Sequence, residues 1–168
     1  MVWFEELQNR KKISKIFYRY EKTFPEEERR SKDQFLDLSE NPDAFVYSIN
    51  HEDENIGYCV IWELQGFYFL EHFEVFEEFR NQKFGEKILE ALKEKFEKLV
   101  LETEPNSLSE IANRRLGFYQ RNGFEVIKEN YLQPSYSEGK SSLQLFLMAN
   151  FLTENLENSI QEIYSTVY

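Results

Sequence analysis

"EVFEEFRNQKFGEKIL", residues 74–89, joins an apolar strand to an amphipathic helix and gathers cations in an otherwise acidic chain. The helix is marked by apolar residues that recur on one helical face: Phe84, Ile88, Leu89, Leu92 and Phe96. A helix that begins near Phe84 leaves its first backbone N–H groups unpaired at the positive end of its dipole, so the preceding loop can bind an anion. Arg80 and Lys83 add positive charge there, and Gly85 lacks the β-carbon that would keep a ligand from the backbone. On charge alone, a solvated basic turn is the commoner explanation of such a cluster.

The segments on both sides of this stretch predict a sheet. Apolar runs that begin at Ala44, Ile56 and Phe67 are separated by short turns, which predicts three antiparallel strands in a meander. The run "LVLETE" from Leu99 follows the helix and reads as a buried strand. Strand, helix and strand in that order predict a right-handed crossover to a parallel strand.

The remaining segments add helices and strands at both ends. A strand over residues 2–7 precedes a helix whose buried face is formed by Ile13, Ile16, Phe17 and Tyr20. Ser31 with Gln34 and Ser107 with Glu110 have capping-box spacing, and the helix after Ser107 is expected to run to a left-handed end at Gly123. Strands "FEVIKE" and "LQLFLMAN" follow, and the last amphipathic segment predicts a helix that docks on the core or contacts a second copy in a homodimer. We therefore predict one α+β domain over residues 1–168, with a mostly antiparallel sheet, flanking helices and one βαβ crossover.

The composition of the chain limits the kinds of molecule that it is expected to bind. The chain has 20 Lys and Arg against 31 Asp and Glu, a net charge of −11, which argues against nucleic acid and anionic membranes as partners. No apolar run reaches the roughly 18 residues of a membrane span, so a cytoplasmic protein that acts on a cationic small molecule is expected. Cys59 reads as a buried core residue, and His51 and His72 lack partners at zinc spacing, so no metal site is predicted.

Two motifs resemble the GNAT superfamily of N-acetyltransferases, most closely a bacterial branch of it. In the first, Arg80 and Gly85 match the first and last positions of the acyl-CoA pyrophosphate motif, and Lys83 occupies its first glycine position. The side chain of Lys83 is expected to point outward and pair with the pyrophosphate. In the second, Asn113, Tyr119 and the pair Gly123–Phe124 have the spacing common in that superfamily. The resemblance covers about residues 44–128.

The resemblance implies an enzyme that transfers the acetyl group of acetyl-CoA directly to a primary amine of a small molecule or peptide. It implies that main-chain N–H near Val75 polarises the thioester carbonyl and that Tyr119 protonates the leaving thiolate. The residues expected to contact acetyl-CoA are Phe73, Val75, Arg80, Asn81, Gln82, Lys83, Phe84, Gly85, Glu86, Asn113 and Tyr119. An acyl-CoA-binding module without turnover and a pure interaction protein are the alternatives.

The general base is sought on the strand "FYFLEHFEV". Strict alternation places Glu71 on one face with Phe67, Phe69, Phe73 and Val75, and His72 on the other face. Apolar surroundings are expected to raise the pKa of Glu71 and make it the base, unless it pairs with a neighbouring Arg. His72 is the second choice. Glu102 and Glu104 are expected to attract a cationic amine or to serve a structural role.

Overall fold

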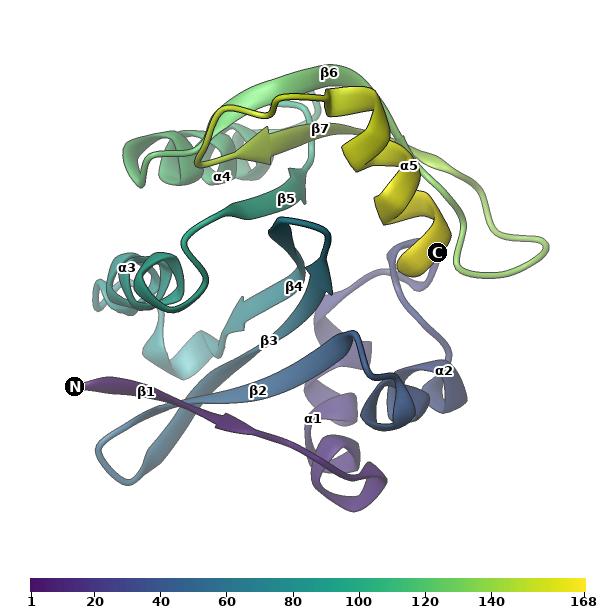
Figure 1. Ribbon diagram of the computed structural model, residues 1–168. Coiled ribbons are helices and arrows are strands. Elements are labelled where there is room, and N and C mark those ends of the chain that lie inside the picture. Colours follow the sequence, from purple (N-terminus) through teal and green to yellow (C-terminus); the bar gives the residue numbers. More distant parts are fainter.

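The computed structural model describes residues 1–168 and contains one seven-stranded sheet (Figure 1). The strands lie in the order β1-β2-β3-β4-β5-β7-β6, and only β4 and β5 are parallel neighbours. The strands are β1 (Val2–Glu6), β2 (Ala44–His51), β3 (Glu54–Leu64), β4 (Phe67–Val75), β5 (Leu99–Thr103), β6 (Glu125–Gln133) and β7 (Leu143–Ala149). This mixed sheet confirms the predicted α+β class with one parallel crossover through a helix.

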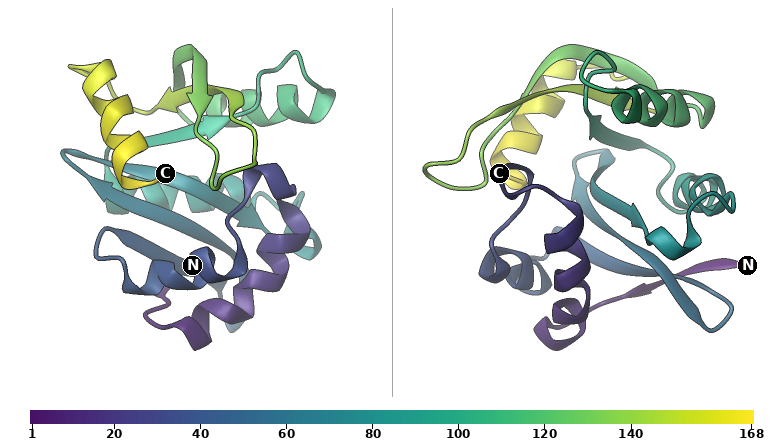
Figure 2. Two further views of the ribbon diagram at one scale, coloured as in Figure 1. Left: turned by 90° about the vertical axis from the view of Figure 1, so that its right-hand side faces the viewer. Right: turned by 180° about the vertical axis from the view of Figure 1, so that it is seen from behind.

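Helices cover both faces of the sheet (Figures 1 and 2). The α-helices are α1 (Arg10–Thr23), α2 (Lys32–Leu36), α3 (Phe84–Phe96), α4 (Glu110–Arg121) and α5 (Leu156–Thr166). Short 3₁₀ segments are η1 (Glu26–Glu28), η2 (Asp37–Glu40) and η3 (Glu77–Phe79). One apolar core joins the sheet to α1, α2 and α5, and a second joins it to α3 and α4. We call the corresponding sides of the sheet the first face and the second face.

Some of the observed helix ends match the predicted ones, and one does not. Ser31 and Gln34 form the predicted capping box at the start of α2. Helix α4, however, is capped by Ser109, whose hydroxyl accepts a hydrogen bond from the Ala112 N–H, so the predicted cap at Ser107 is wrong. Gly123 has a φ of 87° just beyond α4, which confirms the predicted left-handed end.

The C-terminal helix docks on the core of its own chain. Ile160, Ile163 and Val167 are buried in the first core, as the amphipathic pattern predicted. A fully formed docking face within one chain accounts for the apolar stripe without a second copy.

The two parallel strands separate soon after they begin to pair. Only Tyr68–Leu99, Phe69–Val100 and Leu70–Leu101 are paired, and β5 then continues alongside β7. The sheet consequently opens between its β1–β4 part and its β5–β7–β6 part. Beyond Leu70, the edge of β4 that faces β5 has main-chain groups without a partner strand.

A β-bulge in β4 changes which side chains share a face. Val60 pairs with His72 and Ile61 pairs with Leu70, so Glu71 is the extra residue. From this point the alternation shifts: His72 reaches Tyr20 of α1 on the first face, where Glu71 also lies, while Phe73 packs against the second core. The predicted separation of Glu71 and His72 onto opposite faces is therefore wrong, because strict alternation does not hold across a bulge.

Candidate active site

A cleft of about 690 Å³ lies where β4 and β5 separate. Its walls combine the bulged part of β4, the end of β5, the end of α1 and the inner side of α4. Residues from both faces of the sheet line it, including Phe24, Glu28, Glu71, His72, Phe73, Val75, Arg80, Glu102, Glu104, Arg115 and Tyr119. The opening in the sheet thus gives one cavity that two molecules can enter from opposite faces.

The loop before α3 has the features of an anion-binding site. No side chain caps the helix, and its first backbone bond runs from the Lys87 N–H to the Lys83 carbonyl, so the N–H groups of Phe84, Gly85 and Glu86 are free. Asn81 and Lys83 have left-handed φ angles of 61° and 63°, and a loop of this shape turns successive N–H groups toward one side. Positive φ is the conformation for which glycine is favoured, which accounts for a glycine at the Lys83 position in the family motif.

The two cationic side chains of the loop, Lys83 and Arg80, differ in their contacts. Lys83 is exposed and has no ion-pair or hydrogen-bond partner, so its ammonium group is free to meet a ligand. Arg80 instead turns back toward β4, where its Nε donates a 2.9 Å hydrogen bond to the Val75 carbonyl. Its Nη2 lies 3.6 Å from the Glu74 carboxylate. Arg80 therefore ties the loop to the end of β4 and lines the cleft.

Gly85 owes its lack of a side chain to helix packing. A β-carbon at this position would lie 3.1 Å from Cζ of Phe118 on α4. Close packing of α4 on α3 is therefore one reason for a glycine here, and close approach of a ligand to the backbone stays a prediction.

Asn113 and Tyr119, the two candidate residues of the second motif, differ in solvent exposure. Tyr119 is 8% exposed, lines the cleft, and has its pKa raised by burial. Asn113 is exposed on α4 and is not part of the cleft wall. The structure therefore brings Tyr119 but not Asn113 to the cleft.

Glu71 is held in a buried ion pair. Nε and Nη2 of Arg30 lie 3.1 and 3.0 Å from its Oε1, and the Trp62 indole donates a 2.7 Å hydrogen bond to its Oε2. The Tyr136 hydroxyl donates a further bond of 2.7 Å to Oε1. Burial alone would raise the pKa of Glu71, but Arg30 and the hydrogen bonds outweigh burial and hold the pKa well below its usual range. The expected rise in the Glu71 pKa is wrong, and the alternative, pairing with a neighbouring Arg, is confirmed.

Glu102 has the raised pKa that was expected of Glu71. Burial at the end of β5 raises the pKa of its carboxyl to about 8, and the negative charge of Glu71 adds to the rise. The Tyr168 hydroxyl donates hydrogen bonds of 3.1 and 2.9 Å to its two oxygens, and Gln133 donates one of 3.1 Å. These bonds lower the pKa by less than burial raises it, since no cation faces the carboxyl. From the sequence, Glu102 was expected only to attract a cationic amine or to serve a structural role. The segment "LVLETE" does not reveal which of its carboxylates has no neighbouring cation in the fold.

Two further carboxylates lie along the first-face wall. Glu104 forms an ion pair with Arg115 at 2.8 Å. Burial raises the pKa of Glu28, and the charge of Glu104 raises it further. In the lining of the cleft as a whole, carboxylates outnumber cations: Glu28, Glu71, Glu74, Glu102 and Glu104 against Arg80 and Arg115. We call this carboxylate-rich lining the acidic wall, and it favours a positively charged molecule.

The structure thus combines a split sheet, an anion-binding loop beside the second face and buried carboxylates on the first face. Residues 42–126, just over half of the chain, match the acetyltransferase (GNAT) domain family. The chain therefore belongs to the GNAT acetyltransferase family.

Solved structures with similar folds include two acetyltransferases and a protein bound to acetyl-CoA. A protein from Bacteroides thetaiotaomicron described as a GNAT-family acetyltransferase has a TM-score of 0.90 and 29% identity, over 99% of this chain and 98% of that one. The ribosomal-protein-S18-alanine N-acetyltransferase from Escherichia coli has a TM-score of 0.63 and 18% identity, over 93% and 99% of the two chains. NAA60 from Arabidopsis thaliana, solved with acetyl-CoA, has a TM-score of 0.66 and 12% identity, over 90% and 99%. No curated protein sequence matches this chain.

No group of three or more His, Cys, Asp or Glu side chains is arranged to hold a metal ion. No helix is both long and apolar enough to cross a membrane.

Proposed function

We propose that this protein is a single-domain cytoplasmic N-acetyltransferase that transfers the acetyl group of acetyl-CoA directly to a primary amine. The proposal is carried by the cleft between β4 and β5, which has an anion-binding loop beside one opening and an acidic wall along the other. Phosphates are attracted to the first of these features and an ammonium group to the second. The thioester and the amine then meet inside the sheet.

The acetyl-CoA side of the cleft would be formed by β4, the loop and α4. The free N–H groups of residues 84–86, with Lys83 beside them, suit the pyrophosphate. Phe73 and Val75 lie on the unpaired edge of β4, where main-chain N–H groups can hydrogen-bond the pantetheine arm and polarise the thioester carbonyl. Asn81, Gln82 and Asn113 are exposed and do not line the cleft, so contact of these three with acetyl-CoA would involve the part of the coenzyme that lies outside it.

We assign the proton transfers to Glu102 and Tyr119. Ionised Glu102 takes a proton from the ammonium group, because only the neutral amine has a lone pair for attack. The amine nitrogen then bonds to the thioester carbon, and the carbonyl oxygen becomes an oxyanion that β4 N–H groups stabilise. When this intermediate collapses, the C–S bond breaks and Tyr119 donates its proton to the leaving thiolate. The second proton of the attacking nitrogen passes through water to the Tyr119 phenolate, so that a neutral amide and a free thiol result. Glu71 stays ionised and paired with Arg30, and it does not take part in proton transfer.

The acceptor is a small-molecule or peptide amine. The E. coli relative acts on the alanine of a ribosomal protein, so a peptide with an N-terminal alanine belongs in a substrate panel with polyamines and amino sugars. The acidic wall favours acceptors that are cationic before they react.

Calorimetry and a thiol-release assay test the proposal together. Acetyl-CoA is titrated first, and release of free CoA is then followed with each amine. Binding with amine-dependent release is expected, and Tyr119→Phe should lower kcat about tenfold with little change in the acetyl-CoA affinity. Binding without release for any amine would instead identify an acyl-CoA-binding module, and an absence of binding would remove the enzyme proposal altogether.

A further inference from the structure

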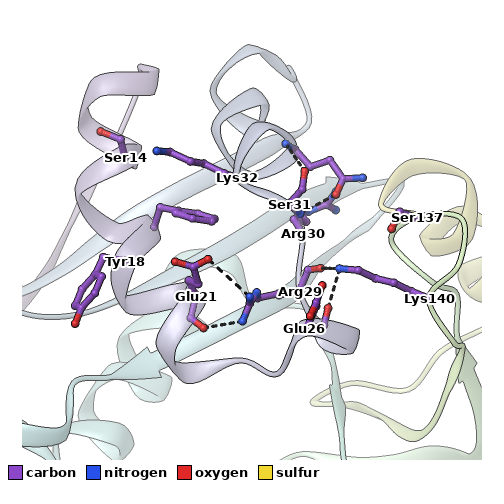
Figure 3. Close-up of a pocket in the computed structure, with 12 residues that line it drawn as sticks. Ser14, Tyr18, Glu21, Glu26, Arg29, Arg30, Ser31, Lys32, Ser137 and Lys140 are labelled. Carbon is purple, nitrogen blue, oxygen red and sulfur yellow. Dashed lines mark hydrogen bonds and ion pairs between the residues drawn. The ribbon is translucent and has the colours of Figure 1, made fainter.

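A second cavity, of about 820 Å³, lies outside the cleft (Figure 3). It is enclosed by α1, by the segment from η1 to the start of α2, and by the loop between β6 and β7. The η1 segment separates the two cavities, since Phe24 and Glu28 line the cleft while Glu26 and Arg29 line this second cavity. We call it the outer cavity.

Cations outnumber carboxylates in the outer cavity. Its charged lining consists of Arg29, Arg30, Lys32, Lys140, Glu21 and Glu26. Arg30 is paired with Glu71, which does not line this cavity, so three other cations face the two carboxylates. The whole chain carries a net charge of −11, and even this small excess of cations departs from the charge of the rest of the molecule. Net negative charge repels anions over most of the surface, and a locally positive cavity is therefore selective for them.

Two of these cations are fixed in place mainly by neutral groups. Nζ of Lys140 donates to the carbonyls of Glu26 and Arg29 at 2.7 and 2.8 Å, and has no carboxylate partner (Figure 3). Nη1 of Arg29 donates to the carbonyls of Glu21 and Phe24 at 2.8 and 3.0 Å, and its nearest carboxylate, that of Glu21, is 3.7 Å away. A carbonyl orients a cation without cancelling its charge. Both cations are thus held in position while most of their charge stays available to a ligand.

The other two cations complete the site from opposite sides. Lys32, at the start of α2, is exposed and has no ion-pair or hydrogen-bond partner. Arg30 is buried, with only 10% of its side chain exposed, and its guanidinium lies between the rings of Trp62 and Tyr136 at 5.3 and 4.9 Å. Since Arg30 also pairs with Glu71, its place in the wall is fixed by the same ion pair that lies beside the cleft.

From these contacts we propose that the outer cavity is a binding site for a small oxyanion, a phosphate or carboxylate group carried by an organic molecule. This site is separate from the pyrophosphate loop before α3 and goes beyond the proposed transferase function. Lys32 supplies an ammonium group from the start of α2 and Lys140 supplies one from the β6–β7 loop. Arg29 and Arg30 also line the cavity, and the Ser137 hydroxyl on the β6–β7 loop is a further donor. A volume of this size also accommodates the organic part of the ligand.

The test is a titration with inorganic phosphate at constant ionic strength, on protein saturated with coenzyme A so that the pyrophosphate loop is already filled. Backbone amide NMR shifts report where the phosphate binds. Saturable shifts are expected at Ser31, Lys32 and Ser137, and Lys32→Gln should weaken the binding about tenfold because a charge-assisted contact is lost. A parallel titration with acetate tells whether the site prefers a phosphoryl or a carboxylate group.

Lys15→Gln is the matched control, because Lys15 is an exposed lysine of α1 that does not line the cavity. It removes the same charge, so its phosphate affinity should equal that of the wild type. The inference is overturned if phosphate causes no saturable shift, if the shifts are confined to residues 80–86, or if Lys15→Gln and Lys32→Gln weaken binding equally. None of these readouts depends on acetyl transfer, so they are independent of the enzyme proposal.

Discussion

Replacement of Glu102 by Gln is the most direct test of whether this carboxylate is the general base. The carboxyl of Glu102 has a pKa of about 8, so close to a tenth of it is ionised at pH 7 and half at pH 8. If its ionised form accepts the proton of the amine, kcat/KM should rise about fivefold from pH 7 to pH 8. Glu102→Gln should remove this rise and lower kcat/KM by roughly 10²–10⁴-fold, the usual contribution of a general base.

The assay must separate this titration from that of the acceptor. An alkylamine loses its own proton as the pH rises, which would also raise the rate, so a hydrazine acceptor with a low pKa is used for the profile. This acceptor is neutral throughout, and ionised Glu102 then takes the proton that the nitrogen loses as it attacks. Free thiol is measured under kcat/KM conditions between pH 6 and pH 9. A hydrazine profile that rises equally in wild type and Glu102→Gln would refute the assignment, as would a variant with undiminished activity.

Stability provides a second measurement that needs no substrate. The pKa of Glu102 is higher in the folded protein, about 8, than the ordinary value near 4.5, so the folded state binds this proton more tightly. Its ionisation therefore lowers the free energy of unfolding as the pH rises from about 4.5 to 8, by an upper bound of roughly 5 kcal/mol at 1.36 kcal/mol per pH unit. Glu102→Gln cannot ionise, so its melting temperature relative to wild type should increase from pH 6 to pH 8.5. A constant difference across that range would contradict the raised pKa.

Three other substitutions test separate parts of the structure. Glu71→Gln leaves Arg30 buried without its counter-ion and should cost roughly 3–5 kcal/mol in urea denaturation at pH 7. Because the pKa of Glu71 is lowered, this cost should shrink as the pH falls below about 4.3, and a pH-independent cost would contradict the ion pair. Lys83→Gly keeps the loop N–H groups but removes the free ammonium, so the acetyl-CoA Kd should rise about threefold in calorimetry, and an unchanged Kd would show that Lys83 does not pair with the pyrophosphate. Gly85→Ala should lower the free energy of unfolding by about 1–3 kcal/mol through contact with Phe118, and Phe118→Leu should restore most of it; no recovery would place the strain elsewhere.

Much of the fold could be predicted because its signals are local. The buried face of α1 repeats at helical spacing, and the apolar runs of β2, β3 and β4 end at turn residues, so each element could be placed from its own residues. Two serines that precede α4 show the limit of such signals. Ser107 has the spacing of a capping box, but Ser109 is the cap, and both are compatible with the same local pattern.

The site was predicted less well because its properties depend on contacts between distant segments. The loop before α3 follows from adjacent residues, and the sequence placed it correctly. Arg30, by contrast, precedes Glu71 by 41 positions and comes from a segment for which the sequence predicted no functional role. Tyr168 reaches Glu102 across 66 positions. Sequence periodicity does not show that such distant side chains are in contact. The pKa values of Glu71 and Glu102, which depend on these contacts, could therefore not be predicted from the sequence.

The bulge in β4 and the ion pair at Glu71 together explain why two neighbouring carboxylates behave differently. Glu71 and Glu102 follow the last paired residues of adjacent parallel strands, and both are largely withdrawn from water. The bulge turns Glu71 toward Arg30, which keeps it ionised, whereas Glu102 faces only neutral donors. The fixed negative charge of Glu71 then makes ionisation of Glu102 harder, so the same guanidinium that lowers one pKa helps to raise the other. Burial is the main cause of the raised Glu102 pKa, and the buried ion pair adds to it by keeping Glu71 ionised.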